Sequence, residues 1–295
     1  MKKVFGNKKA IIIFMTPAVI MYTLFVIYPI IMSIYYSLLD GTPNVNAIFI
    51  GIDNYTRLIG NDDFINSLRV TMQYMIFVAG GWIIFGLLVA LLLNYGVRKY
   101  SHILRTIIYM PVVIPGVGAA AMFSKIFEME PHYGLLNSLL NRVGLEAWIQ
   151  PWAGQSSTVM WTVISADMWR GMGYYAIIFF AGLINIPKEL EEAAKIDGAN
   201  FFQLMRRVVL PLLRPVTIMA CVLAVNNALR VYDLPRVLTN GGPGRASQTL
   251  SLLMTNEAFT RWNFGYGSTI AVVILILTII CTQTIVKLDK KEVTQ

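Results

Sequence analysis

Long apolar segments are the feature that most constrains how this chain can fold. Several are at least as long as the roughly 20 residues that a helix needs to cross hydrocarbon at about 1.5 Å rise per residue. Of the 295 residues, 56% are hydrophobic and 14% are charged, whereas a soluble domain has about 45–50% apolar and about 25% charged residues. The sequence therefore argues against a water-soluble fold and predicts an all-α membrane protein.

About six transmembrane helices are predicted. The first apolar run continues to Leu39, so its helix has to tilt or emerge from the membrane. No internal repeat and no Gly/Ser linker divides the chain, which favours a single transmembrane domain over residues 1–295. The predicted spans are 11–33, 70–94, 103–127, 158–184, 211–232 and 268–287.

The N-terminal lysines followed by an apolar run raise the alternative of a cleaved signal peptide. That run exceeds the 7–15 residues of a signal core, and no small-x-small cleavage site follows it. We therefore expect the segment to be retained as the first span. Cys221 and Cys281 both lie in predicted spans, where a free cysteine behaves as a small buried hydrophobe.

The distribution of Lys and Arg predicts the orientation. The N-terminal tail carries four, the loop between the second and third spans three, the loop between the fourth and fifth spans five, and the C-terminal tail three of the 24 in the chain. By the positive-inside rule, both termini and the loop at 185–210 are expected on the cytoplasmic side. Because the basic residues are spread over separate flanks, the net charge of +8 does not indicate a nucleic-acid partner.

The loop at 185–210 is predicted to form two short helices with a hinge. Gly198 can take the left-handed conformation that ends the first helix, and Asp197 is placed to hydrogen-bond free amides at the turn. An amphipathic hairpin lying on the lipid surface is one interpretation. The small Ala193 and Ala194 favour docking against another protein instead. The second helix is expected to have one apolar face, formed by Phe201, Leu204, Met205 and Val208.

These residues also carry a family resemblance. The pattern resembles the EAA motif of permease subunits of ATP-binding-cassette importers, with Val208 where Ile is more usual as its one departure. Most of the chain is similar to the carbohydrate branch, on the side of the maltose-type first permease. The motif residues are Glu192, Ala193, Ala194, Gly198, Val208, Leu210 and Pro211, and further similarities are Phe49, Gly51, Asn54, Tyr55, 169–171 and 238–243.

The resemblance implies a function and a set of partners. It implies import of a carbohydrate, a di- or oligosaccharide, by alternating access, with a second and different permease subunit, two ATPase subunits, an extracytoplasmic solute-binding protein and membrane lipid. No phosphate-binding G-x-x-x-x-G-K-[ST] occurs in the sequence, so ATP and Mg²⁺ are expected on the ATPase subunits and no cofactor on this chain. The ATPase-coupling residues that it implies are Glu192, Ala193, Ala194, Asp197, Gly198 and Ala199.

Charged and aromatic residues in the spans indicate a substrate path. Asp167 and Arg170 are three residues apart and either form a structural ion pair or face a water-filled cavity. Aromatic faces can cover a sugar ring, and Asn amides donate to and accept from hydroxyls. A membrane Asn can also only bridge helices, and Trp or Tyr can mark the interface. The candidate substrate-binding residues are Trp169, Gly171, Tyr174, Tyr175, Asn226, Asn227 and Arg230.

Two other classes of membrane protein remain to be weighed. His102 and His132 lie in different loops, and no H-E-x-x-H or G-x-S-x-G occurs, so an enzyme is not expected. The remaining alternative is a secondary transporter or channel for a small polar solute, independent of an ATPase. Such proteins often show inverted repeats, matching broken helices or charge rings, none of which we detect. Monosaccharides and polyol phosphates remain alternative substrates, because Arg170 or Arg230 could meet an anion.

Overall fold

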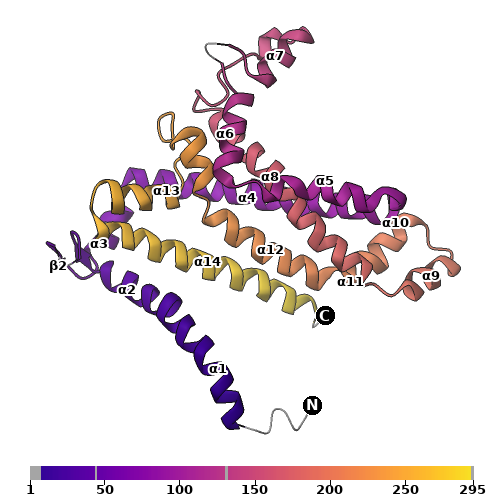
Figure 1. Cartoon of the computed structure of the whole chain (residues 1–295), viewed down its shortest axis with the longest axis horizontal. Coiled ribbons are helices and arrows are strands. Elements are labelled where there is room, and N and C mark those ends of the chain that lie inside the picture. The colour runs from indigo at the N-terminus through magenta and orange to yellow at the C-terminus, as the bar shows by residue number, and fades with distance from the viewer. Residues whose placement is uncertain (1–7, 44, 130–131, 294–295) are drawn as a thin grey trace. The chain divides into compact units, whose positions relative to one another are not determined.

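The protein is almost entirely helical in a computed structural model that describes residues 8–43, 45–129 and 132–293 (Figure 1). Within these residues the only strands are β1 (Leu39–Asp40) and β2 (Ile48–Phe49), which pair antiparallel with Leu39 opposite Phe49. The predicted all-α class is confirmed.

The chain divides into two compact units. Unit 1 comprises Met1–Asn61 and Leu253–Leu275, and unit 2 comprises Asp62–Leu252 and Ile276–Gln295. The boundary falls twice inside helices, in α13 (Leu250–Thr255) and in α14 (Phe264–Val293). Both units carry predicted spans, so the single transmembrane domain stays a prediction.

Unit 1 begins with a long apolar helix. It comprises α1 (Lys8–Tyr22), a π-helical turn at Thr23–Ile27 and α2 (Tyr28–Tyr36). Residues Ile11–Tyr36 are long and apolar enough to cross a membrane, and none of the most apolar stretch is buried within the chain. Exposed apolar surface of this extent is stable only against lipid or another subunit.

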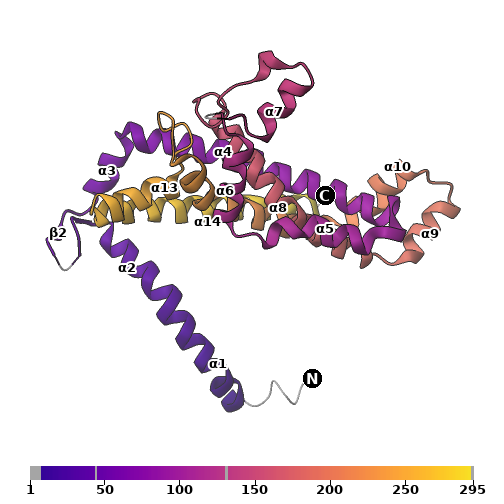
Figure 2. The ribbon, with the colours of Figure 1, turned by 45° about the horizontal axis from the view of Figure 1, so that its top comes forward.

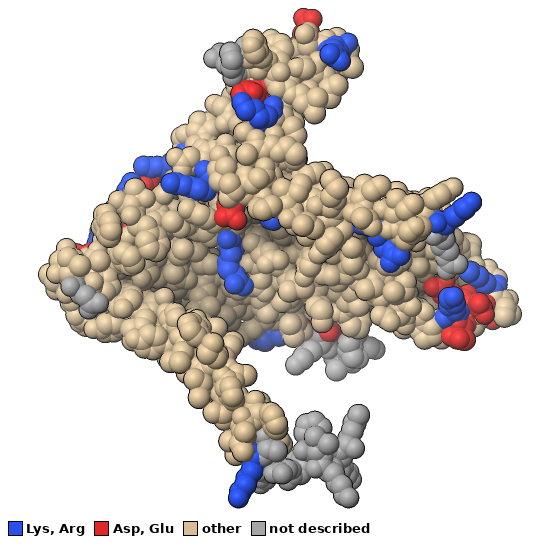
Figure 3. All heavy atoms as spheres, viewed as in Figure 1, with Lys and Arg blue, Asp and Glu red and all other residues tan. Residues whose placement is uncertain are grey.

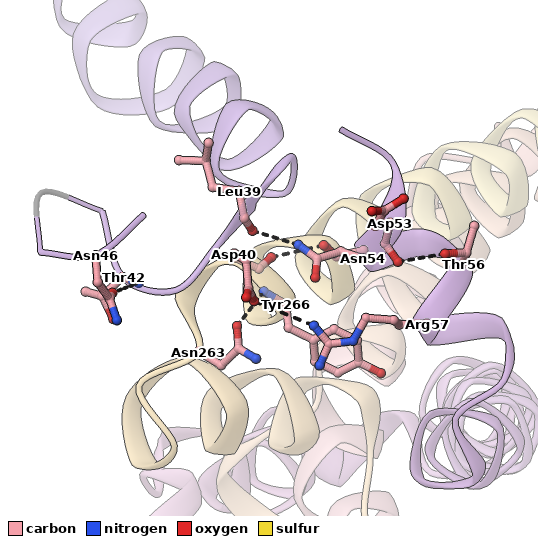
Figure 4. A network of polar contacts seen from close by, with 12 residues as sticks. Leu39, Asp40, Thr42, Asn46, Asp53, Asn54, Thr56, Arg57, Asn263 and Tyr266 are labelled. Atoms are coloured by element: carbon pink, nitrogen blue, oxygen red, sulfur yellow. Dashed lines mark hydrogen bonds and ion pairs between the residues drawn. The ribbon is translucent and has the colours of Figure 1, made fainter. Parts of the chain in front are cut away.

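A buried asparagine organises the polar part of unit 1 (Figure 4). Asn54 lies in α3 (Asp53–Ile59), and its Nδ2 donates to the carbonyl oxygens of Ser37 at 3.1 Å and Leu39 at 2.7 Å. Thr269 of α14 also donates to the Ser37 carbonyl, at 3.2 Å. These bonds satisfy backbone groups where α2 ends, so Asn54 fixes the join between α2, α3 and α14.

Unit 2 is built on two helices that pack along one another, α4 (Asp62–Leu91) and α8 (Val159–Ile184). The helix α12 (Arg214–Leu229) packs on α4, and α5 (Ser101–Val113) packs on α8. Gly86 permits the close approach of α4 and α8, because a Cβ there would lie 2.9 Å from the Cβ of Tyr175. Small residues at helix contacts are typical of membrane proteins.

Three of the predicted spans correspond to single long apolar helical segments, at Ile11–Tyr36, Asp62–Gly96 and Phe264–Asp289. The second begins before the predicted residue 70, because the acidic Asp62 and Asp63 start its first turn and complement the positive helix end. The helix α8 covers nearly all of the fourth predicted span, 158–184, but with its charged residues it does not qualify as a candidate span. Up to five spans result if each bent helix pair counts as one, so the number six stays a prediction.

The third and fifth predicted spans are not single straight helices. Over the predicted 103–127, α5 and α6 (Gly116–Ile126) meet at a 95° bend. Ile114 at the bend is extended (φ −71°, ψ 124°), because a residue before proline, here Pro115, is pushed out of the helical region. The predicted fifth span, 211–232, contains α11 (Leu210–Leu212) and α12, and Phe201–Leu212 is bent by 66° from Arg214–Leu229.

The remaining helical segments lie in the connections. The segment between α6 and α8 contains α7 (Leu135–Arg142) and a 3₁₀ turn at Glu146–Trp148. After α12, a π-helical turn at Pro235–Thr239 ends at Asn240 and Gly241, both with positive φ (50° and 79°). A further π-helical turn, Asn256–Thr260, follows α13.

Candidate substrate cavity and coupling hairpin

The loop at 185–210 forms the predicted pair of short helices. They are α9 (Lys188–Ile196) and α10 (Phe201–Leu204), which continues as a π-helical turn at Met205–Val209. Figure 2 shows both helices at one end of unit 2. We call residues 185–210 the coupling hairpin.

Backbone geometry fixes the turn of the coupling hairpin. Gly198 has φ +80°, and the amides of Gly198 and Ala199 donate to the carbonyls of Lys195 (3.0 Å) and Ala194 (2.9 Å). This is a Schellman ending, which favours glycine at its left-handed position. The expected left-handed ending of the first helix at Gly198 is confirmed.

Asn200 caps the second helix. The expected hydrogen bonds from the Asp197 side chain to free amides at the turn do not occur among the described residues. The Asn200 side chain accepts from the Gln203 amide, and the Gln203 side chain accepts from the Asn200 amide, both at 2.9 Å. This reciprocal capping box satisfies two amides at the start of α10. Asp197 is instead the C-cap residue that follows α9, where its amide donates to the Ala193 carbonyl at 3.0 Å.

The coupling hairpin exposes small and apolar side chains at its tip. Ala193 is exposed, whereas Ala194 packs against the core of unit 2. Figure 3 shows acidic and basic residues gathered over α9. Large hydrophobic side chains of the hairpin are exposed as well. The four most exposed of these are Leu190, Ile196, Phe201 and Phe202, with exposed fractions of 44%, 86%, 60% and 72%. Of the predicted inner face, Leu204 and Met205 are buried and Phe201 is not.

A cavity of about 500 Å³ lies in unit 2 between α4, α8 and the segment that follows α12. Five predicted substrate-binding residues line it. They are Gly171, Tyr174, Tyr175, Asn227 and Arg230, joined by Trp82, Val112, Asp167, Arg170, Val231, Tyr232, Asp233 and Leu234.

An ion pair forms part of the cavity wall. Arg170 contacts Asp167 Oδ1 through Nη2 at 2.8 Å and through Nε at 3.0 Å. The hydroxyl of Tyr74 donates to the other carboxylate oxygen of Asp167, which is 2% exposed. Both sequence interpretations therefore hold, since the charges are paired and also face a cavity. Hydrogen bonds to both oxygens reduce the cost of burying this carboxylate.

Trp82 and Tyr175 form an aromatic wall. Their rings stack at 5.2 Å with an interplanar angle of 19°, and the Trp82 indole donates to the Asp167 carbonyl at 3.0 Å. Gly171 leaves room for the indole, because an added Cβ would overlap the Trp82 ring. Gly171, predicted to bind substrate, lets α4 and α8 bring these rings together.

Asn227 and Arg230 supply polar groups from α12 and its end. Asn227 Nδ2 donates to the Tyr175 hydroxyl at 3.4 Å, and Arg230 Nε donates to the Asn226 carbonyl at 3.3 Å. Both side chains are exposed within the chain. Amide, guanidinium and phenol groups together can donate to and accept from several hydroxyls of one ligand.

Trp169 and Asn226 do not line the cavity. Trp169 packs on Phe123, with ring centroids 5.4 Å apart. The Asn226 side chain bridges α12 to Thr282 of α14, with Nδ2 to Oγ1 at 3.3 Å. Asn226 therefore joins two helices, which is one of the two interpretations that the sequence allows for an asparagine in the membrane.

Sequence reasoning missed Trp82 and Asp233. Trp82 belongs to a different helix from the charged pair, so no local spacing could have connected them. Asp233 lies near the start of α6, where a Cβ on Gly116 would be 3.1 Å from its Oδ2. Its position three residues after Arg230 was an available signal, since opposite charges at this spacing often face one another.

Comparison with known proteins is consistent with this architecture. Residues 82–293 match the family described as "Binding-protein-dependent transport system inner membrane component". The chain is 35% identical to the probable ABC transporter permease protein YurN of Bacillus subtilis over 275 residues, covering 92% of this chain and 93% of the relative. It is 34% identical to the trehalose/maltose transport system permease protein of Thermococcus litoralis over 274 residues, covering 92% and 90%.

The fold has a counterpart among solved structures. A chain of the crystal structure of a bacterial ABC transporter involved in the import of the acidic polysaccharide alginate superposes with a TM-score of 0.83 at 19% identity, covering 98% of each chain. The helical arrangement is thus that of an ABC importer permease. Because the family match and the relatives span most of the sequence, this chain belongs to the family of inner-membrane permease components of binding-protein-dependent ABC transport systems.

Proposed function

We propose that this chain is the permease subunit that carries a di- or oligosaccharide through the membrane into the cytoplasm. The observation that carries the proposal is that one compact unit holds both the coupling hairpin and a cavity with aromatic, amide and paired charged groups. Such a cavity suits a neutral polyhydroxyl ligand, because Asp167 and Arg170 neutralise one another and leave hydrogen-bonding groups facing inward.

Relatives support this class of substrate. They include permeases named for trehalose/maltose and for arabinooligosaccharides, at 34% and 32% identity. A similar chain of known structure belongs to an alginate transporter in complex with an alginate pentasaccharide-bound periplasmic protein. We accordingly assign this chain a second permease subunit, two ATPase subunits and an extracytoplasmic solute-binding protein as partners.

The coupling hairpin is the proposed contact with the ATPase. Its exposed apolar residues and the small Ala193 at its tip form a surface that another protein can cover. ATP and Mg²⁺ would bind the ATPase subunits, and closure of their dimer would move the hairpin. With the coupling hairpin on the cytoplasmic side, both termini are cytoplasmic and the protein lies in the cytoplasmic membrane.

Transport assays test the proposal directly. The chain, together with its permease, ATPase and binding-protein partners, is placed in liposomes, and uptake of labelled disaccharides, oligosaccharides, monosaccharides and glycerol phosphate is measured with and without ATP. We expect uptake of a di- or oligosaccharide that needs ATP and the ATPase. Uptake by this chain without any ATPase would contradict the importer and support a secondary transporter or channel.

A further inference from the structure

A groove separate from the substrate cavity runs between α5 and α8. It has a volume of about 630 Å³. The lining residues of each helix are alternately three positions and one position apart in the sequence. They are His102, Arg105, Thr106, Tyr109, Met110 and Val113 of α5, and Ile177, Phe180, Ala181 and Ile184 of α8. These spacings place one stripe of each helix along the groove.

The groove has a basic end and an apolar end. Arg105 lies over the ring of Phe180, 4.6 Å from its centroid, while Gly173 of α8 lies against Ile108 further along α5. The two helices are therefore antiparallel, and the groove passes from His102 and Arg105 toward Val113 and Ile177. The apolar part consists mainly of aliphatic side chains.

Arg105 is available to an anion. Its Nε donates to the Ser101 carbonyl at 3.1 Å, and its guanidinium stacks on Phe180. In the described ranges no ion pair includes Arg105, in contrast to Arg214, which pairs with Asp289 at 2.7 Å. Of the residues that the structure describes, no Asp or Glu lines the groove. A guanidinium held in this way is well suited to a phosphate group, which it can bind through two N–H donors.

We propose that this groove binds an anionic phospholipid, with its phosphate at Arg105 and one acyl chain along the apolar stripe. The lipid would belong to the cytoplasmic leaflet. This assignment rests on the proposed function, whose orientation puts the start of α5 at the cytoplasmic surface. Basic pockets between membrane helices on that side suit anionic lipid head groups.

The dimensions of the groove fit one leaflet. From His102 to Val113 the stripe extends about 17 Å at about 1.5 Å per residue, close to half of a hydrocarbon core of about 30 Å. A single acyl chain whose head group sits at Arg105 would therefore end near the middle of the bilayer. The other candidate occupant is a helix of the second permease subunit, but the unneutralised guanidinium at the rim favours the phosphate.

Native mass spectrometry of the purified complete transporter tests the proposal. The probes are 1-palmitoyl-2-oleoyl phosphatidylglycerol, phosphatidylcholine with the same chains, and inorganic phosphate. We expect phosphatidylglycerol to be retained in preference to phosphatidylcholine and not to be displaced by millimolar phosphate. Arg105→Gln should lower its retention about fivefold, since one basic residue near an anionic surface contributes about 1 kcal/mol.

Matched variants distinguish lipid binding in the groove from a general effect of positive charge. Lys99→Gln removes the same charge from a nearby exposed residue that does not line the groove, and it should leave retention nearly unchanged. Ala181→Trp fills the apolar part and should reduce retention while keeping Arg105. Equal retention of the two lipids, displacement by phosphate alone, or equal losses in Arg105→Gln and Lys99→Gln would overturn the proposal.

Cross-linking addresses the competing occupant. A Met110→Cys variant that forms a disulfide with an engineered cysteine of the second permease subunit in high yield would show that a protein helix fills the groove, and would also overturn the lipid site. Lipid retention is read from mass and not from uptake. A transporter that retains phosphatidylglycerol but moves no sugar would therefore contradict the proposed function and not the lipid site.

Discussion

Tyr95 donates a hydrogen bond of 2.8 Å to Glu191, which joins the helical extension of α4 to the first helix of the coupling hairpin. The Tyr95 ring also meets Phe201 of α10 edge-on, with centroids 5.8 Å apart. About 20 Å away along the same helix, Trp82 stacks on Tyr175 in the cavity wall. One helix thus contacts both the coupling hairpin and the cavity.

Removing the Tyr95 hydroxyl should loosen this connection. Tyr95→Phe keeps the ring against Phe201 and loses the bond to Glu191, at a cost of about 1.5 kcal/mol for a partly buried bond to a carboxylate. We expect the number of sugar molecules imported per ATP hydrolysed to fall about tenfold, with ATP hydrolysis itself preserved. Uptake and phosphate release are measured in the same liposomes.

Tyr100→Phe serves as the matched control. Tyr100 is 56% exposed, and its ring lies under Lys99 at 5.7 Å. Within the described part of the chain, no hydrogen bond or ring contact joins it to the hairpin. An unchanged ratio in Tyr95→Phe, or an equal change in both variants, would show that the bond between Tyr95 and Glu191 does not couple the two regions.

Adjacent asparagines should behave differently. Asn227→Ala removes an amide from the cavity and should raise the KM for sugar about 2- to 10-fold, the range expected for one hydrogen bond. Asn226→Ala removes the bridge to Thr282 and should lower thermal stability while leaving KM nearly unchanged. Uptake kinetics and thermal unfolding of both variants decide the matter. A larger KM effect for Asn226 would contradict the placement of the site.

The local features of the coupling hairpin were predictable from sequence, because they depend on residues close together in the chain. Gly198 ends α9 through its own backbone conformation. The cavity was predictable only in part. Tyr174 and Asn227 lie on apolar helices near charges, but the approach of Trp82 depends on the packing of α4 against Gly171 of α8, and no single helix encodes that contact.

The bend after α5 illustrates a different limit. Hydropathy stays high across 103–127, so the sequence was interpreted as one span. Pro115 nevertheless excludes Ile114 from helical geometry, and a break costs little where other groups satisfy the backbone. Apolar composition predicts that a segment enters the membrane, whereas the proline decides whether it continues straight.

Conformation at Gly198 should control coupling independently of side-chain volume. A Cβ there meets no atom within 4 Å, so substitution costs only backbone strain, about 1–2 kcal/mol for most residues. Gly198→Val should lower ATP-dependent uptake about 5- to 30-fold while the protein stays in the membrane. Asparagine tolerates positive φ better than most residues, so Gly198→Asn should retain most uptake. Similar activity in the two variants would contradict the role of the left-handed turn.

The Tyr74 hydroxyl should stabilise unit 2 by partnering Asp167. Tyr74→Phe leaves one oxygen of a 2% exposed carboxylate without this donor, which is expected to cost about 1–3 kcal/mol. Arg170 still pairs with Asp167, so the fold should persist with a lower unfolding temperature. Thermal unfolding in detergent measures the change. Tyr55→Phe, which removes a hydroxyl bonded to Ser37 at 2.7 Å in unit 1, is the comparison. An equal or larger loss in Tyr55→Phe would argue against a special role for the buried carboxylate.

Gly173 should determine how closely α5 packs on α8. A Cβ at this position would overlap the backbone carbonyl of Ile108, and a backbone group cannot rotate away as a side chain does. Gly173→Ala is therefore expected to force the helices apart, at about 1–3 kcal/mol for overpacking. At Gly80 of α4 no atom lies within 4 Å of an added Cβ, so Gly80→Ala should be neutral. A thiol-reactive dye, which reports Cys221 and Cys281 as heating exposes them, measures both variants. Equal unfolding temperatures would mean that the contact between Gly173 and Ile108 relaxes without cost, and that α5 is not held to α8 by this close approach.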